Sequence, residues 1–248
     1  MKSSNPSVSV IVPFLNEPNI LRTYQKIKSE LQSYPNRFQI VFVSDGSKPS
    51  AITVLKKAIK KDKQTMLVEY RPNRGRGYAV KQGFKNANGE YLLYIDSDLD
   101  IHERHIKKIL AALKKFDVAI GSKVHPKSHV NTRFTRKIAS PLLNAIVRVG
   151  LGTNVHDHHV GLKGFRKEVI KTILPSITQS RWMFDAEIIK LARDNNFTIG
   201  EVPVSMTYGT GPLRLSYARY FWDILVFIMA FRLKRLKLQA TGLLGVSE

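Results

Sequence analysis

The chain has 248 residues, of which 43% are hydrophobic and 24% charged, an ordinary composition for a globular protein. Forty Lys and Arg against nineteen Asp and Glu give a formal net charge of +21, which suits an anionic ligand, nucleic acid or lipid but also serves solubility. The absence of cysteine excludes disulfides, thiolate nucleophiles and Cys-ligated zinc. No segment reaches the roughly 18 to 20 apolar residues that span a bilayer, so we expect a soluble or surface-bound protein.

Short β-rich runs alternate with helical patterns through the first half of the chain. Strands are predicted at 7–14, 38–44, 65–70, 91–96 and 117–121, and helices at 18–33, 50–62, 77–87 and 103–115. The alternation and the nearly continuous apolar strands predict a mostly parallel α/β sheet flanked by helices. Ligands of such sheets bind beyond the carboxyl ends of the strands. Three candidate ligand turns lie there, at 16–18, 44–47 and 96–100.

The second half begins with a basic segment, 122–148, which contains six Lys or Arg and no acid. Its later part is amphipathic, and we expect a surface element at 138–151 that is broken near Pro141. A helix near 181–195 and a strand at 199–206 follow. The simplest division is one compact domain at 1–212 and an amphipathic, basic helix and tail at 213–248.

The predicted C-terminal helix, 217–238, has aromatic residues first, then the apolar run ILVFIMAF, then four basic residues. This order is typical of a helix at a membrane interface. Basic residues of this kind add about 1 kcal/mol each on an anionic leaflet. A helix that packs on the core or in a dimer would have a similar pattern, so both alternatives stay open.

Three carboxylates, Asp96, Asp98 and Asp100, follow the apolar run YLLYI at alternate positions. In an extended chain such side chains share one face, and close carboxylates repel one another unless a cation lies between them. Oxygen ligands of this kind suit Mg²⁺ or Mn²⁺. A phosphotransferase nucleophile and a solvated helix-capping turn are the alternatives. An EF-hand is excluded because Ile101 and Lys107 stand where it needs Gly and Glu.

Other sequence motifs come before and after these three carboxylates. They are VSVIVPFLNEPNI, VFVSDGS and NRGRGYAVKQGF before it, and DHHVGLKGFRKEVI, WMFDAEII and GEVPVSM after it. In this order they resemble the inverting glycosyltransferases of family 2, which have the GT-A fold, over roughly residues 7 to 215. Within that family the likeness is to the polyprenyl-phosphate (dolichyl-phosphate) mannose and glucose synthases. The resemblance implies a hexosyltransferase that uses Mg²⁺ or Mn²⁺, a UDP- or GDP-sugar donor and a polyprenyl-phosphate acceptor.

The resemblance also implies roles for individual residues. The metal would be bound by Asp96, Asp98 and Asp100, and catalysis would depend on Asp98, Lys123 and Asp185. The resemblance places Lys123 and Arg214 at the acceptor phosphate. Arg133 and Arg136, which precede the amphipathic segment, are expected from their charge to complete this phosphate site, the alternative being a solvated basic face that serves only membrane attraction. The donor would contact Pro13, Leu15, Glu17, Val43, Asp45, Arg76, Asp96, Ser97 and Asp98, with Asp45 reading the base. Departures from the family pattern at Leu15, Ser44, Arg76 and 158–160 leave the base and the sugar open.

The acceptor decides whether a general base is needed. A phosphate monoester arrives ionised and needs only cations, whereas a glycan or protein hydroxyl would need a base, for which Asp185 is the candidate. Asp185 and Glu187 can instead orient loops or pair with nearby cations. The His-rich turn at 156–159 fits no familiar zinc spacing, and Lys163 and Gly164 are expected in a turn near the sugar.

Two other protein classes share parts of this pattern. A nucleic-acid-binding protein would be basic, but the chain lacks the aromatic–basic interleaving of RNA modules and any known DNA-binding signature. A dinucleotide oxidoreductase is not expected because GRGYAVKQG lacks the G-x-G-x-x-G spacing. We therefore expect a peripheral enzyme on the cytoplasmic face of a membrane, with its oligomeric state open.

Overall fold

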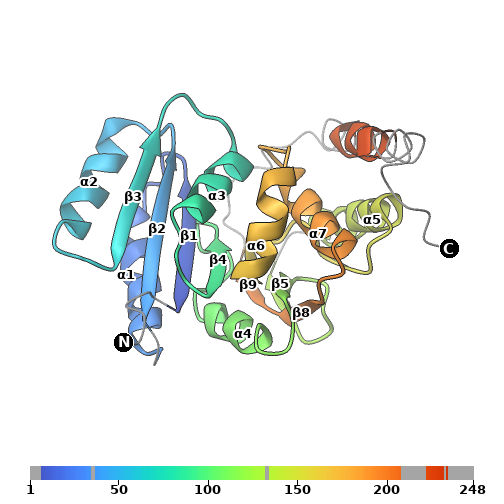
Figure 1. Cartoon of the computed structure of the whole chain (residues 1–248), viewed down its shortest axis with the longest axis horizontal. Helices are drawn as coiled ribbons and strands as arrows, with labels where there is room; N and C mark the ends of the chain where they lie inside the picture. The colour runs from blue at the N-terminus through green and yellow to red at the C-terminus, as the bar shows by residue number, and fades with distance from the viewer. Residues whose placement is uncertain (1–6, 35–36, 132–133, 208–221, 232, 234–248) are drawn as a thin grey trace.

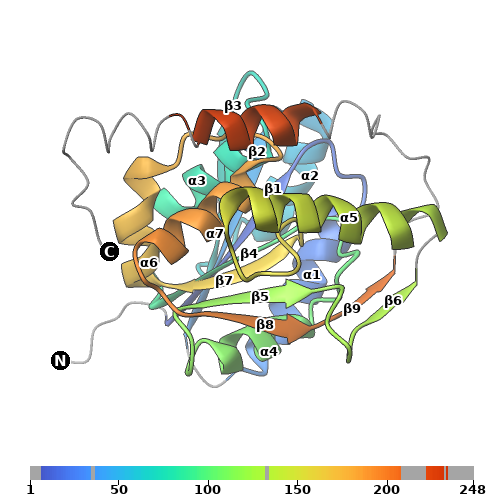
Figure 2. The same ribbon diagram turned by 90° about the vertical axis from the view of Figure 1, so that its right-hand side faces the viewer.

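The computed structural model describes residues 7–34, 37–131, 134–207, 222–231 and 233 (Figures 1 and 2). Its main sheet has seven strands in the order β3-β2-β1-β4-β7-β5-β8, and a small second sheet pairs β6 with β9. The strands are β1 (Val8–Phe14), β2 (Phe38–Asp45), β3 (Thr65–Tyr70), β4 (Tyr91–Ile95), β5 (Val118–Ser122), β6 (His129–Asn131), β7 (Leu162–Arg166), β8 (Ile199–Pro203) and β9 (Ser205–Thr207). The helices are α1 (Ile20–Gln32), α2 (Pro49–Ile59), α3 (Arg76–Lys85), α4 (His105–Ala112), α5 (Phe134–Leu151), α6 (Lys167–Ile173) and α7 (Phe184–Asp194).

The predicted mostly parallel sheet with flanking helices is confirmed. In the sheet, β7 pairs antiparallel with both β4 and β5, and the other pairings are parallel. The predicted turn at Lys163 and Gly164 is wrong, because both residues lie inside β7. Gly164 is needed there, since a Cβ atom would lie 2.4 Å from Ile109 Cγ2 on α4.

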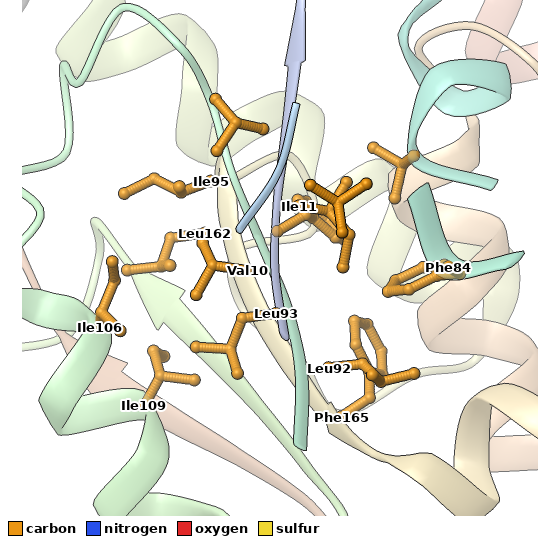
Figure 3. Close-up of a cluster of buried hydrophobic side chains, with 14 of the residues drawn as sticks. Val10, Ile11, Phe84, Leu92, Leu93, Ile95, Ile106, Ile109, Leu162 and Phe165 are labelled. Atoms are coloured by element: carbon orange, nitrogen blue, oxygen red, sulfur yellow. The ribbon is translucent and has the colours of Figure 1, made fainter. Parts of the chain in front are cut away.

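The core has two layers, one on each face of the sheet. Figure 3 shows Leu93 and Leu162 pointing toward Ile106 and Ile109 of α4, whereas Leu92 and Phe165 point the other way, toward Phe84 of α3. Successive residues of a strand point to opposite faces, so an apolar strand such as β4 supplies both layers. This packing fixes the carboxyl ends of β1, β2 and β4 beside one another.

A second apolar cluster joins α5, α7 and the C-terminal helix, of which 222–231 is described. Its buried members are Val147, Leu151, Met183, Ala186, Ile224, Phe227 and Ile228. The helix α5 is continuous through Pro141, so the predicted break is wrong. The division at 212 and 213 falls outside the described residues and stays a prediction. None of the described helices is long and apolar enough to cross a membrane.

Candidate active site

A cleft of about 430 Å³ opens at the carboxyl ends of β1, β2 and β4. The order β2-β1-β4 reverses at β1, which is where open α/β sheets bind ligands. Eight of the nine residues predicted to contact the donor line this cleft, namely Pro13, Leu15, Glu17, Asp45, Arg76, Asp96, Ser97 and Asp98. Val43 does not, because its side chain is fully buried in the core of β2. Their roles toward a donor stay predictions.

The loop after β1 is fixed to the loop after β2. Asn16 has a positive φ of 51°, and its backbone N–H donates to Ser47 Oγ at 3.0 Å. Its side-chain Oδ1 accepts from the backbone N–H of Lys48 at 2.7 Å. This turn leaves Leu15 50% exposed at the edge of the cleft.

Asp45 lines the cleft, but both of its carboxylate oxygens are occupied by the loop at 70–75. Oδ1 accepts from Tyr70 Oη at 2.8 Å and from the Arg74 N–H at 2.8 Å. Oδ2 accepts from Asn73 Nδ2 at 2.8 Å and from the Gly75 N–H at 2.9 Å. A carboxylate has about four acceptor sites, so Asp45 is saturated. These bonds shape the loop that leads into α3, and the role of Asp45 in reading a base stays a prediction.

The carboxylates after β4 lie in a turn rather than in an extended chain. The Leu99 N–H donates to the Asp96 carbonyl at 3.3 Å, and Leu99 has a positive φ of 53°. The strict alternation that predicted three converging side chains therefore ends after Asp98. Asp100 is absent from the cleft lining. Within the described ranges, no group of three or more acidic or histidine side chains is already arranged to hold a metal, and the three-ligand site stays a prediction.

Asp96 and Asp98 still form an acidic pair in the cleft. Burial, with the charges of Asp96 and Asp100, raises the pKa of Asp98 to about 7. Asp96 lies directly over Gly161, where a Cβ atom would come within 1.9 Å of Asp96 Oδ2. A divalent cation would relieve the repulsion between two carboxylates that raises such a pKa. Mg²⁺ is often held by one or two carboxylates together with substrate phosphates. The pair fits such shared binding.

An ionic network extends from Asp96 into the interior of the protein. Arg76 Nε donates to Asp96 Oδ1 at 2.6 Å and its Nη1 to Asp185 Oδ2 at 2.6 Å. Asp185 Oδ1 accepts from Lys163 Nζ at 2.6 Å and from Tyr94 Oη at 2.5 Å. The Lys163 side chain is 0% exposed and that of Asp185 is 4% exposed. The network joins α3, β4, β7 and α7 behind the cleft.

This network makes Asp185 a poor general base. Burial alone would raise its pKa, but the charges of Arg76 and Lys163 outweigh burial and hold the pKa of Asp185 well below its ordinary value. A general base works best with a pKa near the operating pH and with room for the proton that it takes. Asp185 lines the cleft, yet both of its oxygens already accept hydrogen bonds from the network. Its contacts are those of a structural anchor.

Of the four residues predicted to bind the acceptor phosphate, Lys123 is the one whose side chain the structure describes, so their grouping stays a prediction. Lys123 lies outside the cleft lining, its Nζ is 3.2 Å from Asp157 Oδ1, and its backbone N–H donates to Asp157 Oδ2 at 2.7 Å. Arg133 and Arg214 lie outside the described residues, as does the side chain of Arg136 on α5. In the His-rich turn, His158 is fully buried with Nε2 2.7 Å from Thr153 Oγ1, whereas His159 lines the cleft.

Several cleft residues were missed by the sequence analysis. They are Phe14, Asn73, Gly75, His159, Arg181 and Trp182. Arg181 and Trp182 come from the loop before α7 and are both exposed. The one signal in the sequence was an aromatic and a basic residue side by side just before FDAE, which alone does not say where the loop lies.

The family model of glycosyl transferase family 2 matches residues 9–174 of this chain. A dolichyl-phosphate beta-glucosyltransferase of Dictyostelium discoideum is 31% identical over 219 residues, covering 82% of this chain and 67% of the relative. The Saccharomyces cerevisiae protein of that name is 28% identical over 91% of this chain and 75% of its own length. A glycosyltransferase, AglD, of Haloferax volcanii is 26% identical over 79% of this chain, which spans only 32% of that relative.

Solved structures give the same fold. Glucosyl-3-phosphoglycerate synthase of Mycobacterium tuberculosis in complex with UDP superposes with a TM-score of 0.64 at 18% identity, covering 91% of this chain and 79% of that one. The same enzyme in complex with Mn²⁺, UDP and its product has a TM-score of 0.64 at 16% identity, covering 90% and 80%. The fold is therefore that of a GT-A glycosyltransferase, and the chain belongs to glycosyl transferase family 2.

Proposed function

We propose that this protein transfers glucose from UDP-glucose to a polyprenyl (dolichyl) phosphate. The names of the Dictyostelium and yeast relatives support a glucosyl group and this acceptor. The complexes of the mycobacterial enzyme support a uridine nucleotide. These findings favour UDP-glucose over the GDP-mannose and UDP-N-acetylglucosamine that the sequence left open.

The observation that carries the proposal is that both carboxylate oxygens of Asp185 already accept hydrogen bonds from the protein. A glycan or protein hydroxyl must lose its proton as it attacks, and the carboxylate that the sequence offered for this task is bound by Arg76, Lys163 and Tyr94. A phosphate monoester is already ionised and attacks without a base. The anchoring of Asp185 therefore favours a phosphate acceptor over a hydroxyl acceptor.

In the proposed reaction, an oxygen of the acceptor phosphate forms a bond to the anomeric carbon of the donor sugar. The bond from that carbon to the donor diphosphate breaks, and its electron pair leaves with UDP. A divalent cation bound by Asp96, Asp98 and the diphosphate would stabilise this leaving charge as a Lewis acid. Arg76, beside Asp96 in the cleft, keeps the carboxylate oriented and adds positive charge near the diphosphate.

We further propose that the enzyme lies on the cytoplasmic face of an anionic membrane, where its acceptor resides. The helix at 222–231 buries Ile224, Phe227 and Ile228 against α5 and α7. On its other side Trp222 is 65% exposed, Val226 49% and Met229 62%, a spacing of four and three residues that puts them on one stripe. An apolar stripe of this kind, led by tryptophan, supports insertion into a lipid interface.

The test is a transfer assay with radiolabelled UDP-glucose, Mn²⁺ and farnesyl phosphate as a short polyprenyl phosphate. We expect a labelled glycolipid that extracts into organic solvent, less product from GDP-mannose, and no product after EDTA. A variant with Asp96→Asn and Asp98→Asn should lose the Mn²⁺-dependent binding of UDP-glucose in calorimetry. Failure to form a glycolipid from any donor would refute the acceptor assignment.

A further inference from the structure

The loop between α6 and α7, at 177–183, carries two exposed side chains that the proposed reaction has not used. Arg181 and Trp182 both line the cleft, and Trp182 is 48% exposed. Arg181 is exposed and forms no salt bridge with any residue that the structure describes. Trp and Arg are the residues that most often dominate binding energies at interfaces. The pair is therefore a candidate ligand contact.

Hydrogen bonds to Glu187 and from Lys81 hold the loop that carries Arg181 and Trp182. The Glu187 carboxylate, 3% exposed, accepts from the Thr178 N–H at 3.0 Å, from Thr178 Oγ1 at 2.6 Å and from the Gln179 N–H at 2.7 Å. Lys81 Nζ donates to the Ile177 carbonyl at 2.5 Å. Four hydrogen bonds on the first three residues leave little freedom to the two that follow. A rigid support of this kind is what a binding site needs for preorganisation.

The loop also sits directly on the entry to α3. The Tyr78 N–H donates to the Ser180 carbonyl at 3.0 Å. Gly75 has a φ of +100°, and a Cβ atom there would lie 2.5 Å from the Ser180 carbonyl oxygen and 2.8 Å from Arg181 Cγ. The absence of that side chain lets the stem of Arg181 cross the Gly75 backbone. Arg181 thus reaches the same cleft as Arg76.

Arg181 is the cleft arginine that forms no salt bridge with a carboxylate among the described residues, so its charge suits an anionic ligand. The arginines that line the cleft are Arg76 and Arg181, and Arg76 is already paired with Asp96 and Asp185. An ionised phosphate prefers a guanidinium because two parallel N–H donors match its oxygens. Leu15, 50% exposed, and Trp182 add apolar surface to the same cleft. A phosphate that carries an apolar chain matches both features.

We propose that Arg181 and Trp182 form the acceptor subsite, with the guanidinium on the phosphate and the indole, together with Leu15, on the start of the apolar chain. This inference rests on the proposed function. It places the acceptor phosphate at the loop before α7 rather than at Lys123, Arg133 and Arg136. Glu187 is then the positioning residue of the subsite.

The kinetic test compares Arg181→Gln and Trp182→Ala with Arg37→Gln, which removes an exposed arginine at the amino end of β2, away from the cleft. Loss of a charge-assisted hydrogen bond should raise the KM for farnesyl phosphate by about tenfold or more in Arg181→Gln. The KM for UDP-glucose should stay within about twofold of the control. Trp182→Ala should also raise the KM for farnesyl phosphate, and Trp182→Phe, which keeps an aromatic ring, should raise it less. An unchanged KM for farnesyl phosphate in Arg181→Gln, or an equal rise in the KM for UDP-glucose, would overturn the assignment.

A binding test separates this inference from the proposed function. The chain has two tryptophans, so Trp222→Phe leaves Trp182 as the sole indole reporter. Farnesyl phosphate without donor should shift its emission, and Arg181→Gln should weaken that response about tenfold. If wild-type protein transfers glucose but Trp182 does not respond, the subsite is wrong and the function stands. If Trp182 responds in this way but no sugar is transferred, the subsite stands and the proposed function fails.

Discussion

Replacing Asp185 with Asn would show whether this carboxylate anchors the site or acts as a base. Asn has nearly the same shape but removes the negative charge shared by Arg76 and Lys163. Because the Lys163 side chain is 0% exposed, its ammonium would be left without its counter-ion. Breaking a buried pair in this way costs about 3 to 5 kcal/mol. For a chain of this size each kcal/mol lowers the Tm by roughly 2 to 4 °C, so we expect a fall of at least about 6 °C.

Urea unfolding followed by circular dichroism measures this loss. The matched control is Glu69→Gln, which breaks a solvent-exposed pair with Lys56 whose side chains are 42% and 53% exposed. Such a surface pair is worth about 0 to 1 kcal/mol. In Asp185→Asn with Lys163→Met, part of the lost stability should return because no unpaired buried charge remains.

The pH dependence of the difference in stability between wild type and Asp185→Asn gives a second test. The pKa of Asp185 is held below its ordinary value of 3.8 by Arg76 and Lys163. A carboxylate with a depressed folded-state pKa contributes stability that is fully present above the unfolded value and is lost as the pH falls below it. The gap in free energy of unfolding between wild type and Asp185→Asn should therefore be constant at neutral pH and shrink below about pH 4.

The result that would refute this reasoning is a stable Asp185→Asn variant. If the variant unfolds like the wild type and binds UDP-glucose normally, but its kcat falls by about a hundredfold or more, Asp185 acts as a general base. The acceptor would then be a hydroxyl. A loss of stability together with weaker donor binding supports the anchoring role.

Three further outcomes are expected. Gly161→Ala should displace Asp96, because the new Cβ atom would lie 1.9 Å from Asp96 Oδ2, and calorimetry should then show weaker Mn²⁺-dependent binding of UDP-glucose. The control is Gly152→Ala, which is strained by a φ of +60° but lies outside the cleft lining and should lower only the stability. Glu187→Gln should loosen the loop of Trp182 and so lower the fluorescence anisotropy of Trp182 in the Trp222→Phe background. It should also raise the KM for the acceptor more than the KM for the donor, and equal rises in the two KM values would count against a positioning role. Burial and the charges of His159 and Lys163 lower the pKa of buried His158 from 6.5 to about 3, so the free energy of unfolding should fall as the pH drops from about 6.5 toward 3, with a smaller slope in His158→Gln.

The sequence predicted the sheet and the position of the cleft because both depend on local patterns. Apolar runs such as the one at 91–95 identify buried strands, and the turns after them identify the ligand edge. The strand β7 was missed because Lys163 reads as a surface residue. Its burial depends on Asp185, which is 22 residues away in sequence. Pairing over such distances leaves no local pattern.

Two predicted site residues have surroundings that the sequence did not indicate, for the same reason. Asp100 was expected in the metal group because an extended backbone was assumed, and the positive φ of Leu99 ends that geometry. Asp45 is predicted to read a base, and its two oxygens also accept hydrogen bonds from a loop 25 to 30 residues further along, which the sequence did not indicate. In both cases the residue type and its place after a strand indicated that the residue lies near the ligand edge of the sheet. The partner that decides the role came from another element.

The proposed acceptor subsite and the proposed membrane helix meet at one residue. Met183 directly follows Trp182, is 5% exposed, and packs in the cluster that contains Ile224 and Phe227 of the C-terminal helix. A lipid phosphate cannot leave its bilayer far, so the protein must bring the cleft to the membrane surface. A helix that inserts its exposed stripe while packing on Met183 places the loop of Arg181 and Trp182 next to the lipid. If both proposals hold, the fold would couple attachment to the membrane with presentation of the acceptor phosphate to the donor.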